Sequence, residues 1–334
     1  MNAPTVSVLM TVYNAEPYLE ASLASIAGQS FADCELVVVD DASTDGSLRI
    51  LEDWSQRDSR IKVIPNQQNK GQTPCLNQGL RLCRGAWIAR QDADDLSHPS
   101  RLERQLEYLQ RHPGTVLLGT QGVLINEYSR RIGLLDVPCN AAAILWSAPF
   151  LNPFLHTSVI FRRDIVMGEF GGYDEGFRIA QDYDLWMRLA AMYPTANLEA
   201  RLVSYRHLGS SLSKIGSSTA FEEASRISAR EAGRVFSRSW NSEEQALVAA
   251  FRRGLRAGEV AAFHALRRRL EDEFVARHPG EHAGPASVKT AWKLKIAGSV
   301  AQESPFLGMR EVASALIANP VGVLRWARER AANS

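Results

Sequence analysis

The sequence predicts an α/β fold, in which a mostly parallel sheet is flanked by helices and followed by a helical C-terminal region. Apolar, β-branched runs such as 6–12 and 35–39 have the unbroken hydrophobic character of strands buried on both faces. Stretches with apolar residues at helical spacing alternate with these runs up to residue 125. From about residue 221 only helical spacing is found, so we expect one domain at 1–220 and a helical region at 221–334.

The first 125 residues contain the elements in regular order. Strands are expected at 6–12, 35–40, 61–65, 87–91 and 116–125. Helices are expected between them at 17–27, 48–55, 73–84 and 97–111, the last two ended by Gly85 and by His112-Pro113-Gly114. This alternation is typical of a doubly wound sheet, whose ligands bind at the carboxyl ends of the strands.

The pattern changes after residue 125. Residues 136–155 contain three prolines and predict a loop, followed by a strand at 156–161, a helix that begins at 181 and a last strand at 197–207. The segment 290–334 is weakly amphipathic. Its residues 320–332 are consistent with peripheral contact to a membrane surface, although docking on the protein's own core is the simpler interpretation.

Composition narrows the class of protein. The net charge of +1 over 334 residues argues against a nucleic-acid partner. The four cysteines have no zinc or redox spacing, which predicts buried thiols in a reducing compartment: Cys34, Cys75, Cys83 and Cys139. The sequence shows no signal peptide and no apolar stretch of membrane-spanning length, so we expect a cytoplasmic protein, with contact to the inner membrane face and oligomerisation left open.

An acidic run follows the fourth expected strand. Asp92, Asp94 and Asp95 lie together where an apolar segment ends, and adjacent carboxylates repel one another unless a positive group compensates them. Asp92 and Asp94 point to the same side of an extended chain. The pattern suits Mg²⁺ or Mn²⁺ held together with a diphosphate, and the alternative is a polar turn in which Asp95 opens the next helix.

Two further strands end in polar residues. The run that contains the first strand ends in Thr11 and Tyr13, and the run that contains the second strand ends in Asp40 and Asp41. Because the carboxyl ends of parallel strands meet at one edge of the sheet, we expect these side chains to share a crevice with the acidic run. Helix capping and turn formation are the alternative for Asp40 and Asp41, since Asp-Ala-Ser-Thr-Asp-Gly is rich in turn residues.

Four segments in this order resemble glycosyltransferase family 2, whose nucleotide-sugar-binding fold is called GT-A. They are the strand that ends in Tyr13-Asn14, the turn 39–46, the Asp-Ala-Asp-Asp run followed by His-Pro-Ser-Arg-Leu, and the segment 181–189. The resemblance covers roughly residues 4–215. It implies a GT-A-like, Rossmann-related sheet and a nucleotide-sugar donor.

The resemblance also implies roles for the residues that match its motifs. Thr11 and Tyr13 correspond to the pair that cradles the nucleobase. Asp41, with Asp40 beside it, corresponds to the carboxylate that hydrogen-bonds the base. Lys70, in an Asn-Lys-Gly loop, is a candidate phosphate contact, and a solvated loop lysine is the equal alternative.

The resemblance also implies which residue binds the metal and which residue is the catalytic base. Asp94 matches the metal ligand of the Asp-X-Asp motif, and Asp92 faces the ribose or the donor sugar. Asp182 matches the catalytic base. Relatives have Glu before this Asp, whereas this chain has Gln181, which removes one like charge beside the base.

Four other residues are candidates for diphosphate or acceptor contacts. Arg206 and His207 end the last expected strand, where they are placed to assist at the diphosphate. Tyr173, in a glycine-rich loop, is a candidate contact to the acceptor or donor sugar. His156 is a candidate for the acceptor site, with a satisfied core histidine as the equal alternative.

The chemistry that the resemblance implies is transfer of a sugar, with inversion, from a UDP-sugar to a hydroxyl of a saccharide or lipid-linked glycan. Such an enzyme belongs to polysaccharide or cell-envelope biosynthesis. A divalent metal on Asp94 offsets the charge of the leaving diphosphate, and Asp182 takes the proton of the acceptor hydroxyl.

Other classes fit the sequence less well. A phosphohydrolase of the haloacid-dehalogenase type would use Asp92 and Asp94, but Asp95 and Leu96 replace the residues that such sites require next. A dehydrogenase lacks its Gly-X-Gly-X-X-Gly, and a nucleotidyltransferase lacks its glycine-rich loop after the first strand. A non-catalytic nucleotide-binding module keeps the same site and remains the open alternative.

Overall fold

A computed structural model describes residues 3–208 and 217–278. The chain divides into two compact units, one of residues 1–139 with 154–223 and the other of residues 140–153 with 224–334. We describe each unit by itself.

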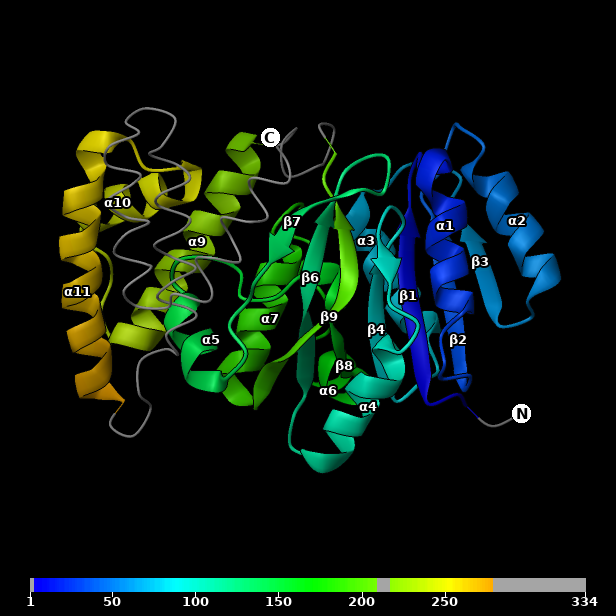
Figure 1. Cartoon of the computed structure of the whole chain (residues 1–334), viewed down its shortest axis with the longest axis horizontal. Helices are drawn as coiled ribbons and strands as arrows, with labels where there is room; N and C mark the ends of the chain where they lie inside the picture. The colour runs from blue at the N-terminus through cyan, green and yellow to red at the C-terminus, as the bar shows by residue number, and fades with distance from the viewer. Residues whose placement is uncertain (1–2, 209–216, 279–334) are drawn as a thin grey trace. The chain divides into compact units, whose positions relative to one another are not determined.

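The first unit is built on one sheet. In the described residues the sheet has nine strands in the order β3-β2-β1-β4-β8-β6-β9-β5, with β7 paired to β6 (Figure 1). The strands are β1 (Val6–Val12), β2 (Cys34–Asp40), β3 (Ile61–Pro65), β4 (Trp87–Asp92), β5 (Leu96–Ser97), β6 (Leu117–Ile125), β7 (Arg131–Leu135), β8 (Ile160–Arg162) and β9 (Thr195–Arg206).

The strand directions bring five strand ends together. β1 pairs in parallel with both β2 and β4. β8 is antiparallel to both β4 and β6, which makes β6 parallel to β4, and β9 is parallel to β6. The carboxyl ends of β1, β2, β4, β6 and β9 therefore lie at the same edge of the sheet.

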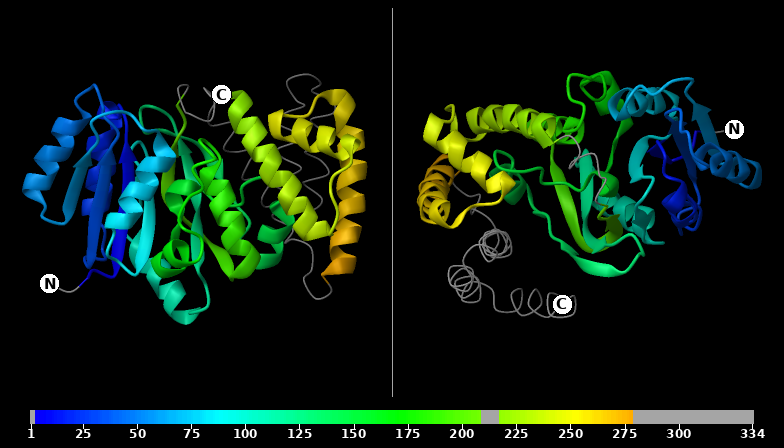
Figure 2. Two further views of the ribbon diagram at one scale, coloured as in Figure 1. Left: turned by 180° about the vertical axis from the view of Figure 1, so that it is seen from behind. Right: turned by 90° about the horizontal axis from the view of Figure 1, so that it is seen from above.

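Helices cover both faces of this sheet. They are α1 (Glu16–Ala27), α2 (Ser47–Arg57), α3 (Gln72–Leu82), α4 (Arg101–Arg111), α6 (Arg163–Gly168), α7 (Gln181–Met192) and the start of α9 (Ser217–Phe236), with a short 3₁₀ turn at His156–Ser158. Apolar residues of α1, α2 and α4 share a core with Val6, Val8 and Met10 of β1. The intervening Leu9 faces α3 at Gly79, because successive strand residues point to opposite faces. Figure 2 shows α3 and α7 on the face opposite to α1.

The second unit is helical. It contains α5 (Ala141–Ser147), the remainder of α9, α10 (Ser242–Arg253), a 3₁₀ turn at Ala257–Glu259 and α11 (Val260–Arg277). Its core is rich in aromatic side chains: Trp146 meets Phe236 and Phe274 edge to face, and Phe251 stacks on Phe263 at 4.7 Å. This burial gives the unit a hydrophobic core of its own.

The structure confirms the predicted α/β fold, its mostly parallel sheet and its helical C-terminal region, and it corrects three local predictions. The helix expected from Ser97 begins at Arg101, because Leu96 and Ser97 pair with β9 instead. The strand expected at 156–161 is a 3₁₀ turn followed by the short strand β8. The supposed loop 136–155 contains α5, whose start is capped by Asn140.

Two other predictions concern cysteines and membrane contact. The four cysteines are free thiols, with Cys139 half-buried and the other three buried. In the residues that the structure describes, no helix has the length and apolar character needed to cross a membrane. The amphipathic segment 290–334, including 320–332, lies outside the described residues.

Candidate active site

The acidic run lies at the edge where the five strand ends meet. Asp92 is the last residue of β4 and is the register partner of Thr11 in β1. Asp94 and Asp95 follow in the turn that leads to β5. Asp40 ends β2 beside Val12. The polar strand ends therefore lie together at one edge of the sheet, as predicted, because parallel strands end on the same side.

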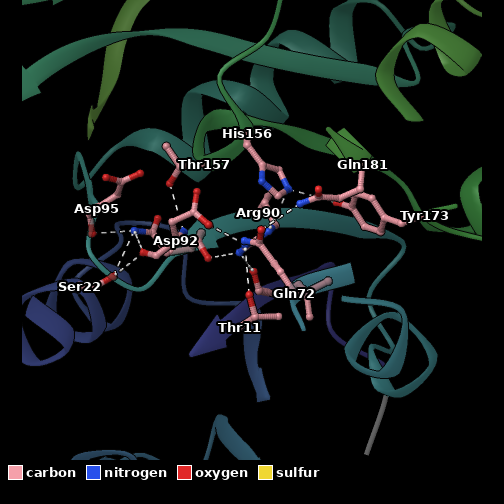
Figure 3. Close-up of polar contacts among 12 residues, drawn as sticks. Thr11, Ser22, Gln72, Arg90, Asp92, Asp95, His156, Thr157, Tyr173 and Gln181 are labelled. Carbon is pink, nitrogen blue, oxygen red and sulfur yellow. Dashed lines mark hydrogen bonds and ion pairs between the residues drawn. The ribbon is translucent and has the colours of Figure 1, made fainter. Parts of the chain in front are cut away.

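A buried arginine compensates the first of these carboxylates. The guanidinium of Arg90 is fully buried, and its Nη2 lies 2.6 Å from Asp92 Oδ1 (Figure 3). It also donates hydrogen bonds to the carbonyl of Leu9 at 3.0 Å and to His156 Nε2 at 3.2 Å. The sequence analysis missed this residue, although a charged side chain in an otherwise apolar strand was a usable signal.

The other two carboxylates are less well compensated. Burial and the nearby Asp92 raise the pKa of Asp94 to about 6, and no cation among the described residues forms an ion pair with it. Asp95 is buried, and its Oδ1 accepts the backbone N–H of Arg206 at 2.7 Å, whereas its Oδ2 has no hydrogen-bond partner in the described parts of the chain. Burial and the charge of Asp94 raise the pKa of Asp95 as well. The turn therefore has negative charge that a cation would stabilise.

These features fit a divalent cation held by few protein ligands. The described residues contain no group of three or more His, Cys, Asp or Glu side chains arranged to hold a metal ion. Mg²⁺ is commonly bound by one or two carboxylates together with substrate phosphates, and such a site needs no preformed cage. Asp94, whose pKa is raised and which has no ion-pair partner among the described residues, is the residue suited to that role.

Arg206 links the acidic turn to its surroundings. Its Nε donates to the carbonyl of Asp94 at 2.8 Å, its Nη1 donates to the carbonyl of Asn126 at 2.8 Å, and its guanidinium lies over the ring of Tyr18. Arg206 is buried, whereas the neighbouring His207 is exposed. Arg206 thus positions the turn that carries Asp94, and contact with a diphosphate remains a prediction for both residues.

At the end of β1, the two predicted nucleobase residues differ in exposure. Thr11 is half-buried, and its hydroxyl accepts a hydrogen bond of 3.4 Å from Arg90. Tyr13 is 52% exposed. An exposed aromatic ring beside a crevice is available for stacking on a planar ligand.

Asp40 and Asp41 are both buried at the end of β2. Asp40 Oδ2 accepts the N–H of Ser43 at 3.1 Å, while its Oδ1 has no partner in the described chain. Asp41 accepts the N–H groups of Lys70 and Gly71, each at 2.8 Å, and so holds the loop 66–71 in place. These bonds are the turn chemistry that was the alternative for this pair, and hydrogen bonding of a nucleobase by Asp41 stays a prediction.

Lys70 extends from the same loop. Its ammonium is exposed and lies 3.2 Å from Asn66 Oδ1 and 3.4 Å from Gln78 Oε1. Neither partner carries a charge, so neither of these two contacts is an ion pair.

Asp182 is the second residue of α7. Burial and the nearby charge of Asp92 raise its pKa to about 6, although the N–H of Tyr183 donates to it at 2.7 Å. The preceding Gln181 is buried, and its Nε2 donates to Gln72 Oε1 at 2.9 Å. A carboxylate with a pKa near 6 is ionised at neutral pH and still accepts a proton readily, as a general base must.

His156 and Tyr173 lie beside Arg90, with His156 half-buried and Tyr173 buried (Figure 3). The Tyr173 hydroxyl lies 3.4 Å from His156 Nε2, and both rings pack against the fully buried Trp186. Burial and the charge of Arg90 lower the pKa of His156 to about 3, so the imidazole is neutral at physiological pH. These contacts fit the core-histidine interpretation of His156. Trp186 and Leu189 are fully buried core residues.

Tyr205 is a further residue that the sequence analysis missed. It lies on β9, and its pKa is raised by burial and by the charges of Asp95, Asp92, Asp94 and Asp182. The phenol therefore lies within the electrostatic field of both the acidic turn and the expected base. It has no motif of its own in the sequence, and only strand pairing brings it to this edge.

Comparison with known proteins identifies the family. Residues 7–168 match the family model described as "Glycosyl transferase family 2". A glycosyltransferase of Haemophilus influenzae, described as uncharacterized, is 32% identical over 237 residues, which cover 68% of this chain and 72% of the relative. The O-antigen biosynthesis glycosyltransferase WbnJ of Escherichia coli is 33% identical over 231 residues, which cover 68% of this chain and 88% of WbnJ. The chain therefore belongs to glycosyltransferase family 2.

Solved structures share the fold at low sequence identity. TarS 1–349 of Staphylococcus aureus in complex with UDP-GlcNAc has a TM-score of 0.57 at 17% identity, covering 94% of this chain and 89% of TarS. The mannosyltransferase PcManGT of Pyrobaculum calidifontis, in complex with GDP-Man and Mn²⁺, has a TM-score of 0.55 at 18% identity, covering 97% of this chain and 88% of PcManGT. Both likenesses support the GT-A fold predicted from the sequence.

Proposed function

We propose that this glycosyltransferase moves a sugar from a UDP-sugar to a hydroxyl group of a saccharide or lipid-linked glycan, with inversion at the anomeric carbon. The observation that carries the proposal is the position of Asp182, whose pKa is raised to about 6 by burial and by Asp92. That coupling supports a single site shared by the expected base and the acidic turn.

The donor class is supported by the structural relatives. TarS is in complex with UDP-GlcNAc and PcManGT with GDP-Man and Mn²⁺, so both hold a nucleoside diphosphate sugar. The acceptor class is supported by WbnJ, an O-antigen biosynthesis enzyme, and by AmsE of Erwinia amylovora, an amylovoran biosynthesis enzyme. We extend these properties to the present chain as a saccharide acceptor in polysaccharide biosynthesis.

Two parts of the site take different steps of the reaction: Asp182 accepts the proton, and the acidic turn stabilises the leaving group. In one displacement, the acceptor oxygen bonds to the anomeric carbon, the bond from that carbon to the diphosphate breaks, and the acceptor proton moves to Asp182. Attack opposite the leaving group inverts the anomeric centre. Asp94 would hold Mn²⁺ or Mg²⁺, whose positive charge stabilises the departing nucleoside diphosphate. Arg90 forms an ion pair with Asp92 at 2.6 Å and so holds this carboxylate in place beside the acidic turn.

The test is the substitution Asp182→Asn. It removes the proton acceptor and keeps the size of the side chain, so we expect kcat to fall by roughly 100- to 10,000-fold while the affinity for UDP with Mn²⁺ changes by less than about twofold. In the wild type, activity should decline as the pH falls through about 6, because the base is then protonated. Calorimetry and a pH series of initial rates measure these quantities.

Asp272→Asn is the matched control, because Asp272 is an exposed carboxylate on α11. It should retain wild-type rates. Full transfer activity in Asp182→Asn would reject Asp182 as the base. Nucleotide binding by the wild type without turnover of any UDP-sugar would instead favour the non-catalytic module.

A further inference from the structure

Three consecutive backbone N–H groups immediately before α7 point at one side chain. The N–H groups of Arg178, Ile179 and Ala180 donate to the carboxylate of Glu223 at 2.8, 2.9 and 2.8 Å. Glu223 lies on α9 and is 5% exposed. A carboxylate taken out of water is stabilised when it accepts several N–H groups, so this contact is specific rather than incidental.

The contact supplies a hydrogen-bond acceptor at the start of α7. The first N–H groups of a helix have no partner within the helix, and a side chain at the N-cap position normally accepts one of them. The N-cap residue of α7 is Ala180, whose side chain cannot do so. Glu223 accepts the N–H of this N-cap residue together with the two N–H groups before it, and its negative charge is favourable at the positive end of the helix dipole.

The segment before α7 is also tied down on its other side. Thr73 Oγ1 donates to the carbonyl of Phe177 at 2.7 Å, and Asn77 Nδ2 donates to the carbonyl of Tyr173 at 2.9 Å. These bonds hold residues further from the helix. Glu223 binds the backbone of the residue that stands two positions before Asp182, so among these three backbone contacts it lies nearest in sequence to the expected base.

We infer that Glu223 is a positioning residue for catalysis, which sets the place of the Asp182 carboxylate by fixing the backbone at 178–180. This inference rests on the proposed role of Asp182. Glu223 lies outside residues 7–168 that match the family model, so its role depends on the helix that follows the sheet.

The inference makes a distinct prediction for rate and for pH dependence. A misplacement of about 1 Å in a reacting group costs roughly 100-fold in rate, and loss of the anchor allows such a displacement. It would also let water reach Asp182. The groups that interact electrostatically with Asp182 are Arg90 and Asp92 of β4, Tyr173 and Tyr205. A substitution of Glu223 leaves all four in place. The pKa of Asp182 should then fall toward its ordinary value, and the acid limb of the rate profile should move to lower pH.

The experiment compares Glu223→Gln with Glu222→Gln. Both substitutions remove one charge from adjacent positions of α9, but Glu222 is exposed. For Glu223→Gln we expect kcat to fall by roughly 10- to 100-fold with the KM for donor within about twofold, together with the shift of the acid limb. Amide hydrogen exchange at 178–180 should accelerate in Glu223→Gln and stay unchanged in Glu222→Gln.

Glu223→Asp keeps the charge on a shorter side chain and should recover part of the lost kcat; it also replaces Glu223→Gln if that variant does not fold. Wild-type kcat and an unmoved acid limb in a folded Glu223 variant would overturn the inference. An equal loss of donor affinity and kcat would assign Glu223 a merely structural role. That result would also overturn the inference. If Asp182→Asn is inactive in the same assay while Glu223→Gln is fully active, only the inference about Glu223 fails, and the proposed function stands.

Discussion

At the scale of single residues, the acidic turn depends on buried cations. Arg90 and Arg101 are both fully buried, and Arg90 pairs with Asp92. Arg101 donates to the carbonyl of Arg90 at 2.7 Å and to Ser97 Oγ at 2.8 Å, and burial together with the charge of Arg90 lowers its pKa to about 9. Two guanidinium groups thus offset part of the charge that the sequence analysis had assigned to a metal alone. The charge of Asp94 is what remains for a divalent ion.

A second buried carboxylate, Glu35, gives a prediction about stability. Its oxygens accept hydrogen bonds from Ser7 at 2.7 Å, from Lys62 at 2.9 Å, and from the backbone and side chain of Arg84. These bonds outweigh the effect of burial and lower the pKa of Glu35 to about 2. A lowered pKa in the folded state stabilises the protein above the unfolded pKa, near 4.5, and this stability is lost as the pH falls toward 2.

We expect Glu35→Gln to lower the free energy of unfolding by about 2–3 kcal/mol at pH 7, because each unit of pKa shift is worth about 1.4 kcal/mol. The difference from the wild type should shrink steadily between about pH 4.5 and pH 2. Urea unfolding followed by circular dichroism at several pH values measures it. A difference that does not depend on pH would show that packing of the side chain, and not its charge, is responsible.

At the scale of elements, the connection from α3 to β4 depends on a close backbone contact. A Cβ atom on Gly85 would lie 2.4 Å from the backbone N of Ser7 and 2.7 Å from the carbonyl carbon of Val6. The N–H of Gly85 also donates to Ser7 Oγ at 2.8 Å. The turn therefore packs directly against the start of β1, and glycine is required because the clashing atoms belong to the backbone and cannot rotate away.

Gly85→Ala should destabilise the protein by about 1–3 kcal/mol, the usual cost of forcing extra atoms into a packed site. Gly168→Ala is the control, because a Cβ there meets nothing within 4 Å and Gly168 ends a helix. The control should change stability by less than about 1 kcal/mol, since alanine is the better helix former. Equal midpoints of urea unfolding for both variants would contradict this account of the turn.

At the scale of the whole molecule, each of the two units has a hydrophobic core in the residues that the structure describes. One lies between the sheet and its helices, and the other is the aromatic cluster of the helical unit. The candidate active site belongs to the first unit, whose five strand ends carry the polar residues. A role of the region 221–334 in acceptor binding, self-association or membrane contact stays a prediction.

Ligand binding at the sheet edge should appear as thermal stabilisation. A ligand that binds only the folded state at a hundredfold excess over its Kd adds about 2.7 kcal/mol. We expect UDP with Mn²⁺ to raise the melting temperature, with GDP and UDP without metal giving smaller shifts. Differential scanning fluorimetry with a panel of nucleotides and nucleotide-sugars makes this measurement.

Asp94→Ala is the matched variant for that panel. It should keep the fold and lose the dependence on Mn²⁺, because it lacks the expected ligand of the metal. The same metal-dependent shift in Asp94→Ala and wild type would move the metal to other residues. A larger shift with GDP than with UDP would show that the donor carries GDP rather than the proposed UDP.

Local sequence was enough to predict most of the first unit. Strands β1, β2 and β6 were expected almost at their observed bounds, because buried parallel strands are continuous apolar runs. The same patterns placed Asp40 and Asp92 at strand ends. Short elements were missed where local signals were weak: β5 has two residues, and α5 follows a proline-containing loop.

By itself, then, the sequence determined the class of fold and the set of polar residues at the sheet edge, because periodicity and strand ends are properties of neighbouring residues. Only the tertiary structure decided which charges meet. Arg90 contacts His156, 66 residues away, and Glu223 binds the backbone at Arg178, 45 residues away. The raised pKa of Asp182 likewise comes from burial and from Asp92 on another element. Such contacts depend on how strands and helices pack, and that packing leaves no pattern along the chain.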